Sequence, residues 1–378
     1  MGLVVEAVEL RGVALPLRRP FRASYGTETA RRSLLIRVIT ADGDGWGECV
    51  ALSEPLYSPE YVDGATAVIR DHLLPRLWSA GAITAGGVAP ALAAVRGHPM
   101  AKSAVEMAVL DAELQRSGRS LASHLGADRT LVPAGVSVGM APVAQLLDAV
   151  AGYVDAGYRR VKLKIGPGSD IEPVRAVRER FGNELLLQVD ANGAYRLTDA
   201  DSLAALDDWG LLMIEQPLAE DDLLGHAELA RRLRTPICLD ESITSARAAA
   251  TAITLGACRV VNIKPGRVGG YLEAQRVHDV CVESGVAAGC GGMLETGIGR
   301  AANLALAALP GFTLPGDVSP PDDYLAEDLT PPLVLNEGCL TVPSGPGIGV
   351  PILADVVQRF TTSVELVRAP ERRVGAGA

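Results

Sequence analysis

Residues 159–166 read RRVKLKIG, a run typical of a buried β-strand that nevertheless carries two lysines, Lys162 and Lys164. Side chains two positions apart in a strand point to the same face. The two ammonium groups are therefore expected to lie side by side. Such a pair is costly unless nearby charges offset it or one lysine gives up its proton. The strand therefore predicts a chemical site as well as a fold.

Strands of this kind recur along the chain with helical stretches between them. The intervening stretches, such as PVAQLLDAVAGYVDAG, have apolar residues at helical spacing. Eight strand–helix units predict an α/β fold with a (β/α)₈, TIM-like barrel at residues 129–340. The alternative is an open α/β sheet with five or six strands. The eight predicted strands are residues 132–139, 159–166, 185–192, 211–217, 236–242, 259–266, 285–292 and 312–318.

The two ends of the chain have a different pattern. In residues 1–128, VEAVELRGVAL and SLLIRVITADGDGWGECV suggest an antiparallel meander, and the helical stretch KSAVEMAVLDAELQRS follows. We predict an α+β capping domain there. Residues 341–378 are first rich in Pro and Gly and then helical, and we expect them to pack back on the capping domain. The last seven, RRVGAGA (372–378), are expected to be frayed.

The composition argues against nucleic acid or a membrane as a partner. Of 378 residues, 35 are Lys or Arg and 45 are Asp or Glu, which gives a net charge of −10 and a pI near 5.1. This balance disfavours anionic surfaces. No apolar run is long enough to span a bilayer. The charged residues Glu6 and Glu9 interrupt the apolar core that a signal peptide would need. The six cysteines form no C-x-x-C pair, so we expect a reduced, cytoplasmic protein.

Three carboxylates mark the ends of consecutive predicted strands: Asp190, Glu215 and Asp240, each 25 residues after the last. In a barrel the catalytic groups lie at the C-terminal ends of the strands. Clustered carboxylates repel one another unless a cation lies among them, and oxygen ligands favour Mg²⁺ or Mn²⁺. One such residue alone is more simply a strand end or a helix cap, but three in register predict a metal site. Glu241 competes for the fifth-strand position, but it is expected to point to the opposite side.

Lys264 ends the sixth predicted strand, which lies across an eight-stranded barrel from the second. Lys164 and Lys264 would then face each other over the barrel mouth. A small anionic carboxylate substrate held by the metal would place its α-carbon between the two amines, so that one takes a proton and the other returns one. We expect Lys162 and the metal to lower the pKa of Lys164 until its amine can act as a base.

At these residues the sequence resembles the muconate-lactonising subgroup of the enolase superfamily. Within the subgroup it is most similar to the N-succinylamino acid racemase/o-succinylbenzoate synthase family, also called N-acylamino acid racemases, over essentially the whole chain. The motif is Lys162-Leu163-Lys164 with Asp190, Glu215, Asp240 and Lys264. The supporting blocks are GWGE (45–48), VDAN (189–192), IEQP (214–217), LDES (239–242), NIKPGRVGG (262–270), PFRASYG (20–26), PLYSPEY (55–61), GVSVG (135–139), CGGMLETGIGRAANLALA (290–307) and LPGDVS (314–319).

The resemblance implies a Mg²⁺- or Mn²⁺-dependent enzyme that forms a homo-oligomer, commonly an octamer. In racemisation of N-acylamino acids, Lys164 and Lys264 would exchange proton-donor and proton-acceptor roles. In o-succinylbenzoate formation Lys164 would do the acid/base work, and Lys264 would stabilise the intermediate as a cation. The substrate contacts that it implies are Ser137, Asn192, Arg22, Tyr57, Gly291, Gly292 and Met293.

One departure from the family lies just before Cys290, where relatives usually carry an aromatic residue and this chain has Gly289. We expect this change to open the pocket wall or loosen the seventh strand, and so to alter acyl or side-chain preference. The eighth strand has Asp317-Val318-Ser319 and lacks the D-x-D expected of dipeptide epimerases.

Several other functions compete with N-acylamino acid racemisation. One is o-succinylbenzoate synthesis for menaquinone as the main role, and another is a muconate-type cycloisomerase. A third is a catalytically inactive barrel used as a scaffold, which the intact lysines and carboxylates disfavour. A mandelate-racemase-type dehydratase needs a His–Asp dyad, and none of the five histidines ends a predicted strand.

Overall fold

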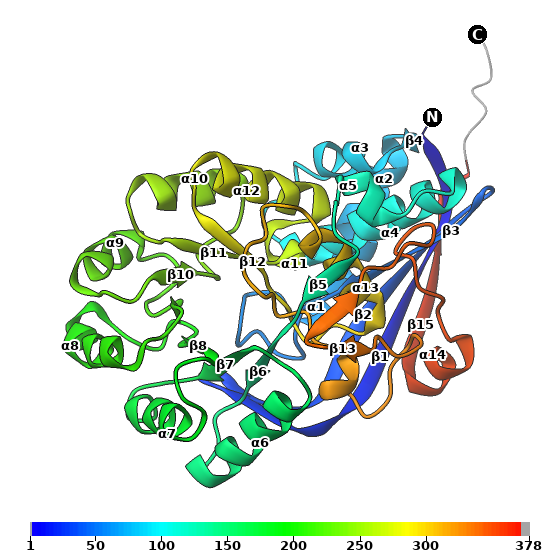
Figure 1. The fold of residues 1–378 in the computed structure, drawn as a ribbon. Coiled ribbons are helices and arrows are strands. Elements are labelled where there is room, and N and C mark those ends of the chain that lie inside the picture. The colour runs from blue at the N-terminus through cyan, green and yellow to red at the C-terminus, as the bar shows by residue number, and fades with distance from the viewer. Residues whose placement is uncertain (1, 372–378) are drawn as a thin grey trace.

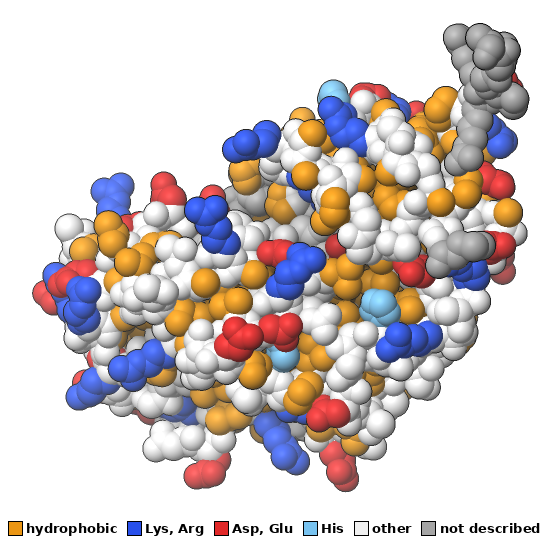
Figure 2. Space-filling view, turned by 90° about the horizontal axis from the view of Figure 1, so that it is seen from above, with side chains coloured by type: hydrophobic (Ala, Val, Ile, Leu, Met, Phe, Trp, Pro, Cys, Tyr) orange, Lys and Arg blue, Asp and Glu red, His pale blue; other side chains and the backbone are white. Residues whose placement is uncertain are grey.

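The computed structural model describes residues 2–371, so the expectation for residues 372–378 lies outside the described residues. An antiparallel sheet formed by the beginning of the chain lies beside a group of parallel strands (Figure 1). Helices from α6 to α10, and α12, follow the outer side of the parallel strands (Figure 1). On the face seen in Figure 2, acidic and basic side chains are interspersed.

The antiparallel sheet contains the meander that the sequence predicts. Its strand order is β15-β1-β2-β3, and β4 pairs with β1. The strands are β1 (Leu3–Ala23), β2 (Gly26–Thr40), β3 (Gly43–Cys49), β4 (Ala82–Ile83) and β15 (Thr361–Arg368). The helices of this part are α1 (Val62–Val68), η1 (Ile69–Leu73), α2 (Leu74–Ser79), α3 (Ala85–Ala91), α4 (Pro99–Ser117) and α5 (Leu121–Leu125).

The GWGE block, residues 45–48, explains how the sheet packs on α4. A Cβ atom at Gly45 would lie 2.2 Å from the carbonyl oxygen of Ala108, and one at Gly47 would lie 2.1 Å from that of Ala104. The backbones of β3 and α4 therefore touch at two successive turns of the helix. Glu48 accepts hydrogen bonds from the Thr296 hydroxyl at 2.8 Å and the Gly299 amide at 3.0 Å. This carboxylate thereby links the sheet to the start of α13 (Gly297–Ala307).

Gly47→Ala is expected to destabilise the protein by about 1–3 kcal/mol or more, because the new methyl group overlaps a backbone carbonyl that cannot rotate away. Gly152→Ala is the matched control. Gly152 lies in α6 (Val143–Asp155) with open space around its Cβ position, so alanine there should stabilise by up to about 1 kcal/mol. Urea unfolding of both variants measures the difference. Equal stabilities of Gly47→Ala and the wild type would refute the close approach.

The parallel strands carry the predicted lysines and carboxylates. Seven strands run in the order β12-β11-β10-β9-β8-β7-β6, and each pairs in parallel with its neighbour. They are β6 (Gly135–Val138), β7 (Arg160–Lys164), β8 (Leu186–Asp190), β9 (Ile214–Glu215), β10 (Ile237–Leu239), β11 (Val260–Ile263) and β12 (Ala287–Cys290). The intervening helices are α7 (Ile171–Phe181), η2 (Leu197–Asp199), α8 (Ala200–Ala204), η3 (Ala205–Trp209), α9 (Leu223–Arg232), α10 (Ala246–Thr254), α11 (Pro265–Val268) and α12 (Tyr271–Glu283).

The eighth predicted strand, residues 312–318, is not a regular strand. It makes single parallel bridges, from Phe312 to Ala288 of β12 and from Gly316 to Ala134 just before β6. The Asp317 amide also donates to the carbonyl of Cys290 at 2.8 Å. Pro315 has no N–H to donate, so it interrupts a ladder at this position. The segment thus closes the ring between β12 and β6 with isolated contacts, and the α/β fold with a barrel-like parallel sheet is confirmed.

The end of the chain returns to the antiparallel sheet. β13 (Leu335–Asn336), β14 (Cys339–Thr341) and β5 (Leu131–Pro133) form a small sheet, and η4 (Pro321–Asp323) and α14 (Ala354–Phe360) complete the elements. β15 pairs antiparallel with β1. The amide of Ile348 donates to Asp111 of α4 at 2.8 Å. The division of the chain at residues 128/129 and 340/341 stays a prediction.

The described residues add two observations on the bulk properties. No helix in residues 2–371 combines the length and apolarity required to cross a bilayer. All six cysteines are free thiols, and all except Cys339 are buried.

Candidate active site

The predicted lysines and carboxylates lie together at the C-terminal ends of the parallel strands. Lys164 and Asp190 are the last residues of β7 and β8 and pair directly across the sheet. Asp190 in turn pairs with Glu215 at the end of β9. Asp240 follows β10 and Lys264 follows β11 by one residue. This register arises because parallel strands align their C-terminal ends at one edge of the sheet.

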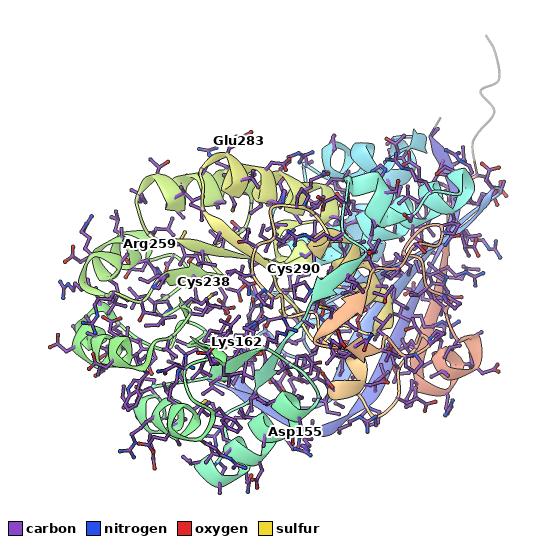
Figure 3. All side chains as sticks on the ribbon, viewed as in Figure 1. Asp155, Lys162, Cys238, Arg259, Glu283 and Cys290 are labelled. Carbon is purple, nitrogen blue, oxygen red and sulfur yellow. The ribbon has the colours of Figure 1, made fainter. Side chains whose placement is uncertain are left out.

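Lys162 is the most enclosed of the three lysines, with 3% of its surface exposed. Figure 3 places it toward the centre of the ring of strands. Its Nζ lies 2.5 Å from Asp317, 3.1 Å from Glu215 and 3.2 Å from Asp190. Burial alone would lower the pKa of Lys162, but these three carboxylates raise it well above its ordinary value. The three carboxylates therefore favour the ammonium form of Lys162.

Lys164 is bound to Asp190 and Asn192, and its Nζ lies 2.7 Å from an oxygen of each. The charge of Lys162 lowers the pKa of Lys164 as expected, but the net shift is in the opposite direction, and the effect expected of the metal stays a prediction. Burial and the Lys162 charge both lower the pKa, but Asp190 outweighs them, and the pKa lies above its ordinary value. The physical reason is distance, because a carboxylate in direct contact outweighs a more remote like charge.

Lys264 has a corresponding carboxylate on the other side of the site. Its Nζ lies 2.7 Å from Asp240 and 3.1 Å from the hydroxyl of Tyr57, and 4.9 Å from the centre of the Tyr57 ring. Arg267 forms a second ion pair with Asp240. Burial opposes ionisation of Asp240, but Arg267 and Lys264 hold its pKa well below the ordinary value.

Glu215 is surrounded by amide donors as well as by Lys162. Asn262 donates to it at 2.7 Å and Gln188 at 2.9 Å. Burial, together with the charge of Asp190, raises the pKa of Glu215 to about 7. Additional positive charge nearby would lower the pKa of Glu215 and stabilise its ionised form.

The donor set suits a hard divalent ion, although cations of the protein now contact it. Within residues 2–371, no group of three or more His, Cys, Asp or Glu side chains is arranged to hold a metal ion. Lys162 lies within 3.2 Å of both Asp190 and Glu215, while Lys264 and Arg267 contact Asp240. Carboxylate oxygens are the ligands that Mg²⁺ and Mn²⁺ prefer. Asp190, Glu215 and Asp240 are thus the right type of ligand for such an ion. The carboxylates of Asp190 and Glu215 converge on one point, which the Lys162 ammonium occupies.

A small cavity of ≈ 50 Å³ lies over these groups. Four of the predicted substrate contacts, Ser137, Tyr57, Gly292 and Met293, line it. The other residues around it are Phe21, Tyr25, Leu52, Lys162, Lys164, Lys264, Leu294, Arg300, Asp317, Ser319 and Tyr324. All three lysines of the site are thus open to one space, and Lys164 and Lys264 approach it from opposite strands.

The three other predicted substrate contacts lie away from the cavity wall. Arg22 is an exposed residue near the end of β1, and its carbonyl accepts from the Met140 amide at 2.9 Å. Gly291 packs against Lys264, because a Cβ there would lie 2.6 Å from the lysine Cγ. Asn192 does not line the cavity, but it accepts a hydrogen bond from Lys164, which does.

Several residues around this cavity were not predicted from the sequence. Asp317 contacts Lys162 and, at 2.8 Å, Arg160. Its position at the end of the eighth predicted strand was the available signal. Tyr25 lies in the turn between β1 and β2, and its ring packs edge-on against Tyr57 at 5.6 Å. A hairpin turn that is distant in sequence carries no local signal of that contact.

Glu241 was expected to point away from the site, and that expectation is wrong. It is 7% exposed and accepts a hydrogen bond from Asn192 at 2.8 Å. The strand β10 ends at Leu239, so the alternation of side chains no longer applies at residue 241.

Gly289 opens a different space from the one expected. It borders a separate small hollow inside the ring, together with Met213, Cys238 and Leu314, and it does not border the cavity over the lysines. A Cβ at Gly289 would meet only Leu314, at 3.9 Å. The absence of an aromatic side chain at residue 289 therefore leaves room in the interior of the barrel, beside Glu215.

Comparisons with known families agree with this arrangement. Residues 6–126 match the mandelate racemase/muconate lactonizing enzyme N-terminal domain, and residues 145–356 match the enolase C-terminal domain-like family. The chain belongs to the mandelate racemase/muconate lactonizing enzyme group of the enolase superfamily, as the motif predicted.

Individual relatives indicate which type of enzyme within the superfamily this chain is. The chain is 62% identical over 360 residues to an N-succinylamino acid racemase from an Amycolatopsis species, which covers 95% of this chain and 98% of the relative. It is 45% identical over 369 residues to an o-succinylbenzoate synthase from Geobacillus kaustophilus, over 97% and 98% of the two chains. An enolase-superfamily structure from Listeria innocua has a TM-score of 0.93 at 40% identity, over 97% of this chain and 100% of that one. The chain is an enzyme of the N-succinylamino acid racemase/o-succinylbenzoate synthase type.

Proposed function

We propose that this enzyme racemises N-acylamino acids, with N-succinyl derivatives as the preferred class, by moving the α-proton between Lys164 and Lys264. The observation that carries the proposal is that both amines line one cavity from opposite sides. Counted around the ring of seven strands plus the closing segment, β7 and β11 are four positions apart in either direction. A flat carbon centre between the two lysines is therefore accessible from both faces.

Each lysine is held by a different carboxylate, which favours independent roles. Lys164 contacts Asp190, and Lys264 contacts Asp240. In one direction Lys164, as an amine, takes the α-proton and becomes an ammonium. Lys264, as an ammonium, then gives its proton to the opposite face and becomes an amine. The reverse direction exchanges the two roles. Between two turnovers in the same direction, Lys164 gives its proton to solvent and Lys264 takes one from it, which restores the starting state.

The proposed cofactor is Mg²⁺ or Mn²⁺, held by Asp190, Glu215 and Asp240. Such an ion would supply positive charge to offset the negative charge that develops on the substrate carboxylate. The chain's own contribution is Lys162, a buried cation beside Asp190 and Glu215. Tyr57 contacts both Lys264 and Asp240, and so restricts the position of the Lys264 amine.

We also propose o-succinylbenzoate formation in the same site. The similarity to relatives of both names favours it. Both reactions begin with removal of the α-proton of a carboxylate substrate. Both therefore require a base beside the α-carbon and cations around the substrate carboxylate. A homo-oligomer and a small anionic carboxylate partner remain expectations of the same proposal.

The test is α-proton exchange of N-succinyl-L- and N-succinyl-D-phenylalanine in D₂O with Mg²⁺ or Mn²⁺. Proton NMR follows the exchange, and optical rotation follows inversion. We expect deuterium uptake by both enantiomers together with decay of rotation, and loss of both signals on chelation. Absence of exchange while calorimetry shows bound metal would overturn the substrate class. Exchange with retained rotation would overturn the two-base mechanism.

A further inference from the structure

A buried carboxylate that the mechanism above does not use is linked to Lys164. Glu241 accepts a hydrogen bond from the side-chain amide nitrogen of Asn192 at 2.8 Å. The amide oxygen of the same Asn192 accepts from Lys164 Nζ at 2.7 Å. Glu241, Asn192 and Lys164 therefore form one chain of hydrogen bonds, with Glu241 at the end remote from the amine.

The surroundings of Glu241 make this chain unusual. The second carboxylate oxygen, Oε2, is buried and has no hydrogen-bond partner among the described residues. Burying a carboxylate of which only one oxygen is hydrogen-bonded costs folding free energy. Asn192 also has a positive φ of 44°, and its backbone amide donates to Asp190 at 3.0 Å. The contacts with Glu241 and Asp190 thus hold this amide in one place.

The chemistry of the amide explains what this arrangement achieves. A carboxylate only accepts hydrogen bonds, and Glu241 faces the NH₂ end of the Asn192 side chain, although burial raises the pKa of Glu241 to about 8. The oxygen end is then turned to Lys164. As an ammonium, Lys164 can only donate to that oxygen. As an amine, it still donates one N–H to the oxygen, and its lone pair stays free. With the amide reversed, the NH₂ group would donate into that lone pair.

We propose that Glu241 is a positioning residue that acts through Asn192 to keep the lone pair of Lys164 directed at the substrate. The proposal rests on the two-lysine function proposed above. Lys264 has no such chain, because its partners are Asp240 and Tyr57 directly. The hydrogen-bonded route from Glu241 therefore reaches only one of the two faces of the substrate, while at Lys264 Glu241 acts through its charge alone, which raises the pKa of that lysine.

This asymmetry has a measurable consequence. Racemisation requires proton transfer at both lysines, so a defect at either one slows it equally from both enantiomers. Exchange without inversion requires transfer at one lysine only. Glu241→Gln keeps the size of the side chain, but its amide both donates and accepts, so it no longer fixes the direction of Asn192. Exchange at the Lys164 face should slow while exchange at the Lys264 face continues.

The experiment measures initial α-deuterium exchange of each N-succinylphenylalanine enantiomer by full-length wild type, Glu241→Gln and Asn192→Ala, at saturating Mg²⁺. The Lys264→Ala variant identifies the enantiomer that exchanges at Lys164. We expect Glu241→Gln to slow exchange of that enantiomer about tenfold to a hundredfold, the range for residues that orient an active-site group. The other enantiomer should stay within about twofold of wild type, a change below about 0.4 kcal/mol.

Two further variants make the result specific. Glu241→Gln combined with Asn192→Ala should be no slower than Asn192→Ala alone, because the two residues act in series. Glu106→Gln is the control for loss of a buried carboxylate. Glu106 lies in α4, is 2% exposed, accepts a hydrogen bond from the Leu272 amide and does not line the cavity over the lysines, so both exchange rates should be unchanged.

The outcomes separate the two proposals. Equal slowing of both enantiomers in Glu241→Gln, as from a damaged metal site, overturns the positioning role and leaves the racemase function standing. Unchanged exchange in both has the same meaning. No metal-dependent exchange by the wild type overturns the proposed function and the positioning role together.

Discussion

Replacing Lys264 by alanine is expected to abolish racemisation while leaving deuterium exchange of one enantiomer intact. The amine that serves the opposite face is lost, so no proton can be delivered there. Positioned acid–base groups contribute about 10²- to 10⁴-fold, and we expect a loss of inversion at the upper end of that range. Lys164→Ala should show the mirror-image behaviour, with exchange retained by the other enantiomer only.

The measurement for Lys264→Ala is polarimetry combined with proton NMR in D₂O on both enantiomers. Lys102→Ala is the matched control, because Lys102 is the lysine outside the site and contacts the carbonyl of Val95 at 2.5 Å. It should racemise at the wild-type rate. Racemisation by Lys264→Ala within about tenfold of wild type would contradict the two-base mechanism, since this loss is below the range for a positioned acid or base.

The use of lysine in this chain supports the same assignment. The sequence has four lysines, Lys102, Lys162, Lys164 and Lys264, among 35 basic residues. Arginine therefore supplies nearly all of the surface positive charge. Arginine stays protonated under all ordinary conditions, whereas a lysine amine in a suitable environment can lose its proton. A chain that otherwise prefers arginine places three of its four lysines around one cavity, and two of them, Lys164 and Lys264, are the proposed proton-transfer groups.

The sequence predicted the parallel strands well because each strand has a local cause. Strand runs such as LLLQVDAN contain a buried apolar core and end in a carboxylate, and β8 ends at Asp190 as the pattern predicts. The equal spacing of the strand-end carboxylates predicted that Asp190 and Glu215 lie side by side, because parallel neighbours align their ends, and the two residues do pair. These features depend only on residues that are close in sequence.

The parts that were missed depend on contacts that are distant in sequence. Tyr25 reaches the site from a hairpin turn, and its partner Tyr57 comes from a separate loop. Asp317 contacts Lys162 across 155 positions of the chain. Glu241 was misplaced because the strand ends two residues earlier than the alternation assumed. In each case the tertiary arrangement, rather than local propensity, decides where the side chain points.

Asp240→Asn is expected to have the second large effect, on metal affinity. Asp240 is fully buried and contacts two cations, Lys264 and Arg267. An asparagine removes one of three negative charges in the proposed ligand set, and affinity for hard divalent ions depends on that number. Loss of one charge at an effective contact energy of about 3 kcal/mol or more corresponds to at least about 100-fold weaker binding. Calorimetric titration with Mg²⁺ or Mn²⁺ measures this change without reference to activity.

The same substitution should also destabilise the fold, and a control separates the two effects. Removing one partner of a buried ion pair costs about 3–5 kcal/mol, so unfolding has to be measured beside metal binding. Asp111→Asn is the matched variant. Asp111 is 2% exposed and accepts from the Trp46 and Ile348 amides at 2.8 Å each. It should lose stability but keep the wild-type metal affinity. If Asp240→Asn binds metal as tightly as the wild type, Asp240 is not a ligand, and its role is confined to holding Lys264 and Arg267 in place.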